Sequence, residues 1–387
     1  MPAGGYLGKI LWINLNRKTT SSENLFPEDA QKFIGGYGLG AKILYEKMAK
    51  NIDPLSPDNI LGFITGPLTG TEALIGSRFM AVAKSPLTGM WCDSNAGGRF
   101  GFHLKSAGYD AIFIEGASDQ KVMLYIDEEK VEILDADWLW GKDTTETESL
   151  IKEKYGSHND AAFIGPAGER MALTSGIVTY DARICARGGL GAVMGSKNLK
   201  AVIVSGSKTI QTADPVQVSS LRKSCLPKAR EGLGGLLNRY GTCGLLISAN
   251  ESGDAPVKNW AGAGVADFKT AANISDENVI KYQTKRYGCY KCPVACGGTL
   301  SVTTGKYQTE NAAKIEYETL GAFGTMCLND DVESLIKIND ICNRFGIDTI
   351  STGAAVAFCM EAYEKNVLSQ DDLKGIDLKW GSAEAAV

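Results

Sequence analysis

The sequence is poor in histidine: its 387 residues include only two, His103 and His158. A zinc site built on imidazoles, or a serine–histidine–aspartate triad, needs histidines placed beside other ligands or a nucleophile. With so few of them, we exclude both kinds of site as the basis of this protein's chemistry.

Long apolar runs are also missing. No stretch reaches the about 18 apolar residues that cross a bilayer, although 44% of the residues are hydrophobic. The first residues, MPAGGYLGKILWINL, have no basic segment before an apolar one and no small-residue cleavage site. We therefore expect a first β-strand here and a cytoplasmic protein.

An excess of basic residues is absent as well. Lys and Arg number 40 against 45 Asp and Glu, which gives a formal net charge of −5. This balance argues against nucleic acid or an anionic membrane as the main partner. Glycine is abundant instead, with 45 residues against 11 prolines, and much of it lies in loops of the first half. Such loops indicate a backbone that closely approaches another group.

Short strands joined by glycine-rich turns are predicted up to about residue 206. They cover residues 9–15, 60–66, 78–85, 111–116, 121–127 and 200–206, with sparser helices at 27–34 and 146–155. After a polar connector, apolar residues recur at helical spacing over 330–345 and 349–366. We expect an α+β fold, with a β-rich domain at 1–208 and a mainly helical domain at 209–387.

The C-terminal residues indicate that the chain is cut. Ser382 is a suitable N-cap, and AEAAV begins a helix that stops after little more than one turn. A single turn is too short to be stable by itself. We expect the protein to continue past Val387.

Three of the ten cysteines form a cluster: Cys289, Cys292 and Cys296. In a protein without a leader, this pattern favours a reduced compartment with one metal site. The spacing Cys-x2-Cys-x3-Cys indicates an iron–sulfur cluster, with zinc or unligated thiols as alternatives. A fourth ligand within the chain could come from cysteines at apolar helical positions, where a cysteine is commonly only a small hydrophobe. These are Cys327, Cys342 and Cys359.

Two glycine strings, GGYGLGAK (35–42) and GGLGAVMGSKN (188–198), resemble dinucleotide-binding loops, but neither has the strand–turn–helix context or spacing of that motif. Arg183 and Arg187 precede the second string and lie beside its unencumbered backbone amides. Arginine forks with exposed amides are suited to phosphate. A second such set is WCDSNAGGRFG (91–101) with Arg78. Each could be only a tight turn; together they indicate a large phosphorylated cofactor.

Carboxylates follow the cysteines. Glu316 and Glu318 flank a tyrosine in KIEYETLGAFG, where an apolar setting could prepare a carboxylate for proton transfer. The alternative is a solvated pair at a helix start. Asp348 could accept paired N–H bonds from a heterocycle, or it could be the N-cap of the next helix.

These segments together resemble the tungsten-containing aldehyde:ferredoxin oxidoreductase family. The similarity runs along the whole chain through GKILWINL, GPLTGT, SPLTG, NAGGRFG, AGYDAIFIEG, IGPAGE, ARGGLGAVMGSKNLKAV, GCYKCPVACG and GIDTISTG. It implies that the chain is the N-terminal two-thirds of a longer protein. In that case the fourth cluster thiolate, and a histidine partner of the catalytic glutamate, lie past Val387.

The resemblance implies a tungsten (or molybdenum) ion held by two pterins on a β-rich base domain, with helical domains covering it. It further implies a Mg²⁺ ion that bridges the pterin phosphates through backbone carbonyls of Asn95 and Ile184. Cys289, Cys292 and Cys296 would hold a [4Fe–4S] cluster, and Glu318 would be the glutamate beside the metal. The residues implied at the pterin phosphates are Arg78, Asn95, Gly97, Arg183, Ile184, Ala186 and Arg187, and those implied at a pterin ring are Asn343, Ile347 and Asp348.

The sequence departs from the family at two places. The pterin-ring motif Asp-x-x-Gly-Leu-Asp reads Asn343-Arg-Phe-Gly-Ile-Asp348, so that one carboxylate is replaced by an amide, which keeps an acceptor but loses the charge. Where some members bind a lone iron at a dimer interface with Glu-x-x-His, this chain has Lys337 and Asp340. We therefore expect no such iron, and a homodimer would need another route.

The implied reaction oxidises an aldehyde to a carboxylic acid, with Glu318 as general base, and sends electrons through the cluster to ferredoxin. Basic residues around the cysteines would form the docking surface for ferredoxin: Lys281, Lys285, Arg286 and Lys291. Two alternatives remain, a tungsten subunit of the benzoyl-CoA reductase type and a catalytically inert metal-binding fragment.

Overall fold

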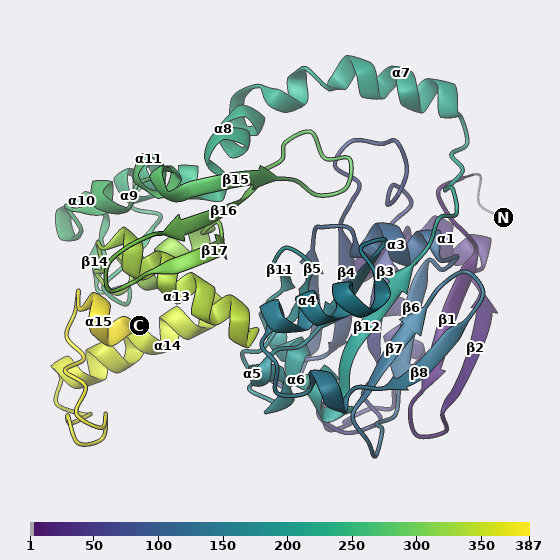
Figure 1. Ribbon diagram of the computed structural model, residues 1–387, viewed down its shortest axis with the longest axis horizontal. Coiled ribbons are helices and arrows are strands. Elements are labelled where there is room, and N and C mark those ends of the chain that lie inside the picture. Colours follow the sequence, from purple (N-terminus) through teal and green to yellow (C-terminus); the bar gives the residue numbers. More distant parts are fainter. Residues whose placement is uncertain (1–3) are drawn as a thin grey trace. The chain divides into compact units, whose positions relative to one another are not determined.

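The computed structural model describes residues 4–387 and contains two compact units (Figure 1). The first unit is the chain up to Pro227 with two later pieces, Cys289–Pro293 and Arg344–Ile347. The second unit is formed by Lys228–Gly288, Val294–Asn343 and Asp348–Val387. The domain division expected at residue 208 stays a prediction. No helix within residues 4–387 is both long and apolar enough to span a membrane.

One six-stranded sheet of the first unit has the strand order β2-β1-β6-β3-β4-β5 (Figure 1). Only β1 and β6 run parallel, and the other neighbours are antiparallel. Helices α1 (Pro27–Phe33) and α2 (Gly36–Lys47) cover its outer face, where α2 packs Leu39 and Ile43 on the sheet. The strands are β1 (Lys9–Asn14), β2 (Thr19–Asn24), β3 (Leu61–Thr65), β4 (Phe79–Lys84), β5 (Trp91–Ala96) and β6 (Ala111–Glu115).

The other six-stranded sheet has the order β11-β10-β9-β12-β7-β8, in which only β12 and β7 are parallel. Its strands are β7 (Val122–Ile126), β8 (Val131–Asp135), β9 (Asn159–Phe163), β10 (Ile177–Thr179), β11 (Arg183–Cys185) and β12 (Leu199–Ser205). The remaining helices of this unit are α3 (Phe100–Ser106), α4 (Thr144–Tyr155), α5 (Pro166–Glu169), α6 (Leu190–Ser196) and α7 (Pro215–Cys225).

The main core of the first unit lies between the two sheets. Side chains alternate along a strand, so Val204 of β12 joins the same buried cluster as Phe63 of β3, while Ile203 packs on the opposite face with Ile151 of α4. Helices α3 and α6 contribute to this core, because Leu104 of α3 and Val193 of α6 belong to the same buried cluster. The phosphate-binding candidates lie within the strands β5 and β11 or next to the ends of β4, β5 and β11.

The second unit is mainly helical. Its long helices are α13 (Val332–Phe345) and α14 (Thr349–Glu364), and a π-helical turn, η7, runs over Leu320–Thr325. A three-stranded antiparallel sheet, β15-β16-β17, accompanies them. The other elements are α8 (Gly232–Tyr240), α9 (Leu246–Ser252), β13 (Pro256–Val257), β14 (Gly262–Ala263), α10 (Gly264–Asp267), α11 (Asp276–Val279), β15 (Gln283–Tyr287), β16 (Gly297–Val302), β17 (Thr309–Ala313), α12 (Tyr317–Thr319) and α15 (Ala383–Ala386).

The expected fold class, a β-rich first part followed by a mainly helical part, is confirmed. The glycine string at 35–42 is not a loop, because α2 begins inside it. Gly40 packs closely on the sheet: a Cβ at this position would lie 2.7 Å from Cδ1 of Ile64, so a larger residue would force that side chain to shift.

Candidate functional site

Arg78 and Asn95 lie side by side on the β4–β5 hairpin. Arg78 directly precedes β4, and the strand register pairs Phe79 with Ala96 and Met80 with Asn95. This brings the guanidinium of Arg78 to the side-chain oxygen of Asn95, which accepts a hydrogen bond from it. Both residues are exposed. The hairpin therefore presents a positive charge and an amide at one end of the first sheet.

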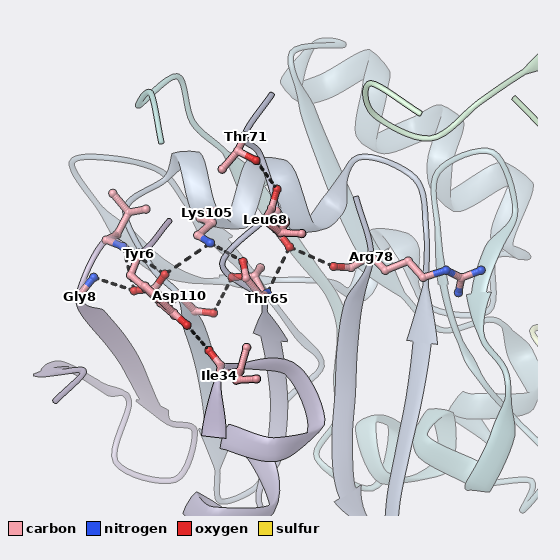
Figure 2. Close-up of polar contacts among 12 residues, drawn as sticks. Tyr6, Gly8, Ile34, Thr65, Leu68, Thr71, Arg78, Lys105 and Asp110 are labelled. Carbon is pink, nitrogen blue, oxygen red and sulfur yellow. Dashed lines mark hydrogen bonds and ion pairs between the residues drawn. The ribbon is translucent and has the colours of Figure 1, made fainter. Parts of the chain in front are cut away.

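A series of partly buried hydrogen bonds holds the backbone of Arg78 in place (Figure 2). The Thr69 hydroxyl donates to the Arg78 carbonyl at 3.2 Å and accepts from the Gly66 amide at 3.2 Å. The ammonium of Lys105 donates to the Gly66 carbonyl. Both the amide and the carbonyl of Gly66 are therefore hydrogen-bonded, and the Thr69 hydroxyl links this loop to the backbone of Arg78.

Lys105 and Asp110 form the buried end of this network. The ammonium lies 3.8 Å from the Asp110 carboxylate, and Asp110 also accepts from the amides of Leu7 and Gly8, at 3.0 and 2.6 Å. Burial lowers the pKa of Lys105 to about 8 although Asp110 opposes this shift, and burial raises the pKa of Asp110. The pattern of residue types in HLKSAGYDAIF gave no sign of this pair, because lysine is seldom fully buried.

Arg187 and Arg183 approach the same hairpin from the second sheet. The amide of Arg187 donates to the Ser94 hydroxyl at 3.2 Å, and a Cβ at Gly98 would lie 3.5 Å from Cγ of Arg183. Ile184 lies on β11, paired with Val178 of β10, and Ala186 precedes the 3₁₀ turn at Arg187–Gly189. The phosphate-binding candidates predicted from separate motifs are therefore neighbours around the end of β5.

The segment Cys289–Pro293 packs on this end of β5. A Cβ at Gly97 would lie only 2.5 Å from Sγ of Cys289, so the sulfur occupies the space that the glycine leaves open. The Tyr290 amide donates to the Gly98 carbonyl at 3.0 Å, and the rings of Tyr290 and Phe102 stack with centroids 3.9 Å apart. Cys289, the first cysteine of the cluster motif, is thereby fixed beside the end of β5.

Cys296 belongs to the second unit, where it directly precedes β16. Asn238 of α8 donates to the Val294 carbonyl at 2.7 Å and so holds the loop before it. Within residues 4–387, no group of three or more cysteine, histidine, aspartate or glutamate side chains is arranged so that it could hold a metal ion.

The three motif cysteines differ in exposure from four other thiols of the described chain. All three are partly exposed, whereas four others are buried and their pKa is raised by burial to about 12. A thiol of such high pKa stays protonated at neutral pH, and the thiolate is the form that binds metal. The buried thiols, which include two of the possible fourth ligands, are Cys185, Cys243, Cys327 and Cys342.

Glu318 is exposed and lies in the single turn α12, directly before the π-helical turn η7. π-Helical turns are rare and are frequent at functional sites. The neighbouring Glu316 accepts a hydrogen bond from the Thr242 hydroxyl. The Thr242 hydroxyl oxygen in turn accepts a hydrogen bond from the Tyr317 amide at 2.9 Å. The loop bearing both carboxylates is therefore anchored, while Glu318 faces solvent.

The residues predicted at a pterin ring have different surroundings. The carboxylate of Asp348 caps α14 and accepts from the amides of Ile350 and Ser351 at 3.1 and 3.0 Å. Ile347 forms a β-bridge with Ser175, and Asn343 lies in the last turns of α13. In the structure, Asp348 is therefore the N-cap of α14, which is the alternative to its predicted contact with a heterocycle.

Three of the four predicted docking residues contact other groups of the protein. Arg286 donates to the Asn238 carbonyl, and Lys291 forms an ion pair with Glu72. Lys281 donates to the Asn278 side chain at 2.6 Å, and Lys285 is exposed on β15.

Comparison with known proteins identifies the class to which this fold and these motifs belong. Residues 10–206 match the family description "Aldehyde ferredoxin oxidoreductase, N-terminal domain", and residues 226–387 match "Aldehyde ferredoxin oxidoreductase, domains 2 & 3". The chain belongs to the aldehyde ferredoxin oxidoreductase family, as its resemblance predicted.

Particular relatives agree with this assignment. The chain is 42% identical to the tungsten-containing aldehyde ferredoxin oxidoreductase of Pyrococcus horikoshii, over 96% of this chain and 61% of that protein. It is 31% identical to the aliphatic sulfonate oxidoreductase, WOR-like subunit, of Pyrococcus furiosus, over 98% of this chain and 63% of the relative. The chain therefore spans less than two-thirds of the length of these relatives.

A solved structure is also similar. The active-site complex of benzoyl coenzyme A reductase with 1,5-dienoyl-CoA superposes with a TM-score of 0.85 at 29% identity, over 96% of this chain and 58% of that one.

Proposed function

We propose that this chain is the cofactor-binding part of a tungsten enzyme that oxidises aldehydes to carboxylic acids and transfers the electrons through a [4Fe–4S] cluster to ferredoxin. The observation that carries the proposal is the grouping of Arg78, Asn95, Arg183 and Arg187 around the end of β5, with Cys289 packed against Gly97. Family membership supports the same function.

The residues around β5 suit a phosphorylated bis-pterin. The guanidinium groups of Arg78, Arg183 and Arg187 would bind its phosphates, and the glycine-rich turn at Gly97 and the backbone at Ala186 would let it approach closely. Carbonyl oxygens are ligands that Mg²⁺ prefers, and those of Asn95 and Ile184 would hold the ion between the phosphates. When bound, the tungsten–pterin group would accept the two electrons released by the aldehyde carbon. Asn343, Ile347 and Asp348 would contact a pterin ring.

Cys289, Cys292 and Cys296 would hold the cluster. Cys289 places its sulfur at Gly97, so a cluster there would be next to the residues proposed to bind the pterin phosphates. These partly exposed thiols are better suited to ligation than the buried ones, because burial opposes the thiolate. The reduced thiols that the cluster needs also support a cytoplasmic location.

Glu318 would be the general base of the reaction. Its exposed carboxylate can take a proton from the water that adds to the aldehyde carbonyl, and the anchored turn around Glu316 keeps its backbone in place. The electrons would leave to ferredoxin, for which Lys281, Lys285, Arg286 and Lys291 remain our proposed contacts. A homodimer without a shared iron remains part of the proposal.

A second candidate function is an aromatic-ring reductase subunit. It is favoured by the TM-score of 0.85 with the benzoyl coenzyme A reductase complex. Substrate tests separate the two candidates. The aldehyde enzyme should reduce ferredoxin with short aliphatic or aromatic aldehydes and leave benzoyl-CoA unchanged. The ring reductase should reduce benzoyl-CoA and leave the aldehydes unchanged.

The proposal is tested on the protein produced anaerobically with tungstate supplied. We expect tungsten, pterin and iron in the purified protein and aldehyde-dependent reduction of ferredoxin. In Glu318→Gln, kcat should fall by about 10²- to 10⁴-fold with metal content unchanged, since a general base contributes about that much. Glu316→Gln is the matched control and should retain activity. Protein free of pterin and iron would show an inert fragment and refute the proposal.

A further inference from the structure

Lys314 is a buried lysine whose ammonium lacks an acceptor. Its residue is 6% exposed, and among residues 4–387 its Nζ has no hydrogen-bond partner. Three other lysines are fully buried, and each donates to a carbonyl oxygen: Lys105 to Gly66, Lys197 to Gly116 and Lys200 to Ile164. A buried charge normally has a partner, because desolvation without one is costly. The position of Lys314 therefore indicates an absent group of negative charge.

The β16–β17 pair brings Lys314 to the cysteine motif. Cys296 directly precedes β16, and Lys314 directly follows β17. The Lys314 amide donates to the Gly298 carbonyl at 2.8 Å, which extends the strand pairing to the end of the hairpin. The lysine thus lies near Cys296 because of strand register, although 17 residues separate the two in the sequence.

The end of the Lys314 side chain and the Cys296 backbone meet at Gly241. A Cβ at Gly241 would lie 2.9 Å from Cε and 3.2 Å from Nζ of Lys314, and 3.1 Å from the Cys296 carbonyl oxygen. The absence of a side chain at Gly241 makes room for the lysine. The ammonium is consequently held close to the third cysteine of the motif.

Several titratable groups of the second unit act on Lys314. Burial lowers the lysine's pKa, and Arg286 lowers it further; the thiols of Cys243 and Cys296, in ionised form, and Glu316 raise it. Cys243 is buried, with a thiol pKa of about 12, so it stays neutral. Glu316 is exposed and accepts from Thr242. Cys296 is the group among them whose charge would change in the loaded protein, because it becomes a thiolate on binding iron.

We propose that the Lys314 ammonium contacts the anionic sulfur of the cluster at Cys296 and raises the cluster's reduction potential. The inference rests on the [4Fe–4S] cluster of the proposed function. Reduction adds one negative charge to the cluster, and a nearby buried positive charge stabilises the reduced state more than the oxidised one. Charge and hydrogen bonds to cluster sulfur are known determinants of such potentials.

The test is a redox titration, followed by electron paramagnetic resonance, of the anaerobically purified, cluster-containing protein. In Lys314→Met, the ratio of reduced to oxidised cluster at a fixed potential should fall by about tenfold, which corresponds to a midpoint lower by about 59 mV for one electron. Lys314→Arg keeps the charge and should stay near wild type. Lys306→Met is the matched control, because Lys306 lies in the same β16–β17 hairpin but is exposed and paired with Glu384.

Each outcome decides the question. An unchanged potential in a Lys314→Met protein that holds its cluster overturns the inference and leaves the proposed function intact. A wild-type protein without iron overturns the proposed function itself. If Lys314→Met loses the cluster, Lys314→Gln is titrated instead; loss of iron from both neutral variants but not from Lys314→Arg supports the charge contact, and loss from all three overturns it.

Discussion

Asp110 shows how single buried residues position this site. It accepts hydrogen bonds from the amides of Leu7 and Gly8 and lies 3.8 Å from the ammonium of Lys105, which in turn fixes the Gly66 carbonyl. The backbone of the exposed Arg78 at the candidate site is thus held through buried and partly buried groups (Figure 2). At the residue scale, stability and the geometry of the site depend on the same contacts.

Replacing Asp110 by alanine should strongly destabilise the first unit. The change leaves the Lys105 ammonium buried without its counter-charge and two amides without their acceptor. Removing one partner of a buried ion pair costs about 3–5 kcal/mol. Urea unfolding of Asp110→Ala should show that the free energy of unfolding is lower than in wild type by this amount. Asp119→Ala removes a carboxylate that is 77% exposed and 3.8 Å from Lys18, so its effect should stay below about 1 kcal/mol. Equal losses in both variants would contradict the role of Asp110.

At the element scale, strands and long helices could be predicted because their patterns are local. The β-strands at 9–15 and 60–66 and the helix at 330–345 follow from alternation and helical spacing, and the structure contains β1, β3 and α13 there. The beginning of α2 inside GGYGLGAK could not be predicted in this way. Gly40 packs closely on Ile64 there, a contact that joins residues far apart in sequence.

The candidate site shows the same division. Arg78, Asn95 and Arg187 were identified from their motifs, but their convergence depends on the pairing of β4 with β5 and on the contact between Ser94 and Arg187. Lys314 was not identified at all. Its role follows from strand register and burial, and neither is visible in the local pattern of KIEYE.

The contact between β5 and the cysteine segment leads to a second prediction. A methyl group at Gly97 would lie 2.5 Å from Sγ of Cys289, so Gly97→Ala must displace the sulfur. A flexible side chain can move at little cost, and we expect the free energy of unfolding to change by no more than about 1 kcal/mol. The protein should nevertheless lose most of its iron, because the ligand is out of place.

Gly66→Ala is the matched control for this variant. It adds the same methyl group in a neighbouring loop, where a Cβ meets nothing within 4 Å. Iron per chain, measured beside the free energy of unfolding, separates the two effects. A Gly97→Ala protein with the iron content of wild type would show that Cys289 does not ligate the cluster in this position.

At the scale of the whole molecule, charge governs how an acidic partner could dock. The formal net charge of −5 opposes the approach of an acidic ferredoxin, so a local basic surface is needed for productive encounter. The proposed basic residues differ in their contacts. Arg286 and Lys291 bond to other groups of the protein, whereas Lys285 is exposed on β15. Lys285 is therefore the residue whose charge is most available to a partner.

Reversal of that charge should slow electron transfer to ferredoxin without changing oxidation of the aldehyde by an artificial dye. For Lys285→Glu we expect kcat/KM for ferredoxin to fall at low salt, because rim charges act mainly on association. The deficit should shrink as salt rises, since the Debye length decreases from about 10 Å at 0.1 M to about 3 Å at 1 M. Lys50→Glu makes the same change in net charge at another exposed lysine and should behave like wild type. If both variants show the same salt dependence, only the overall charge matters, and ferredoxin docks elsewhere.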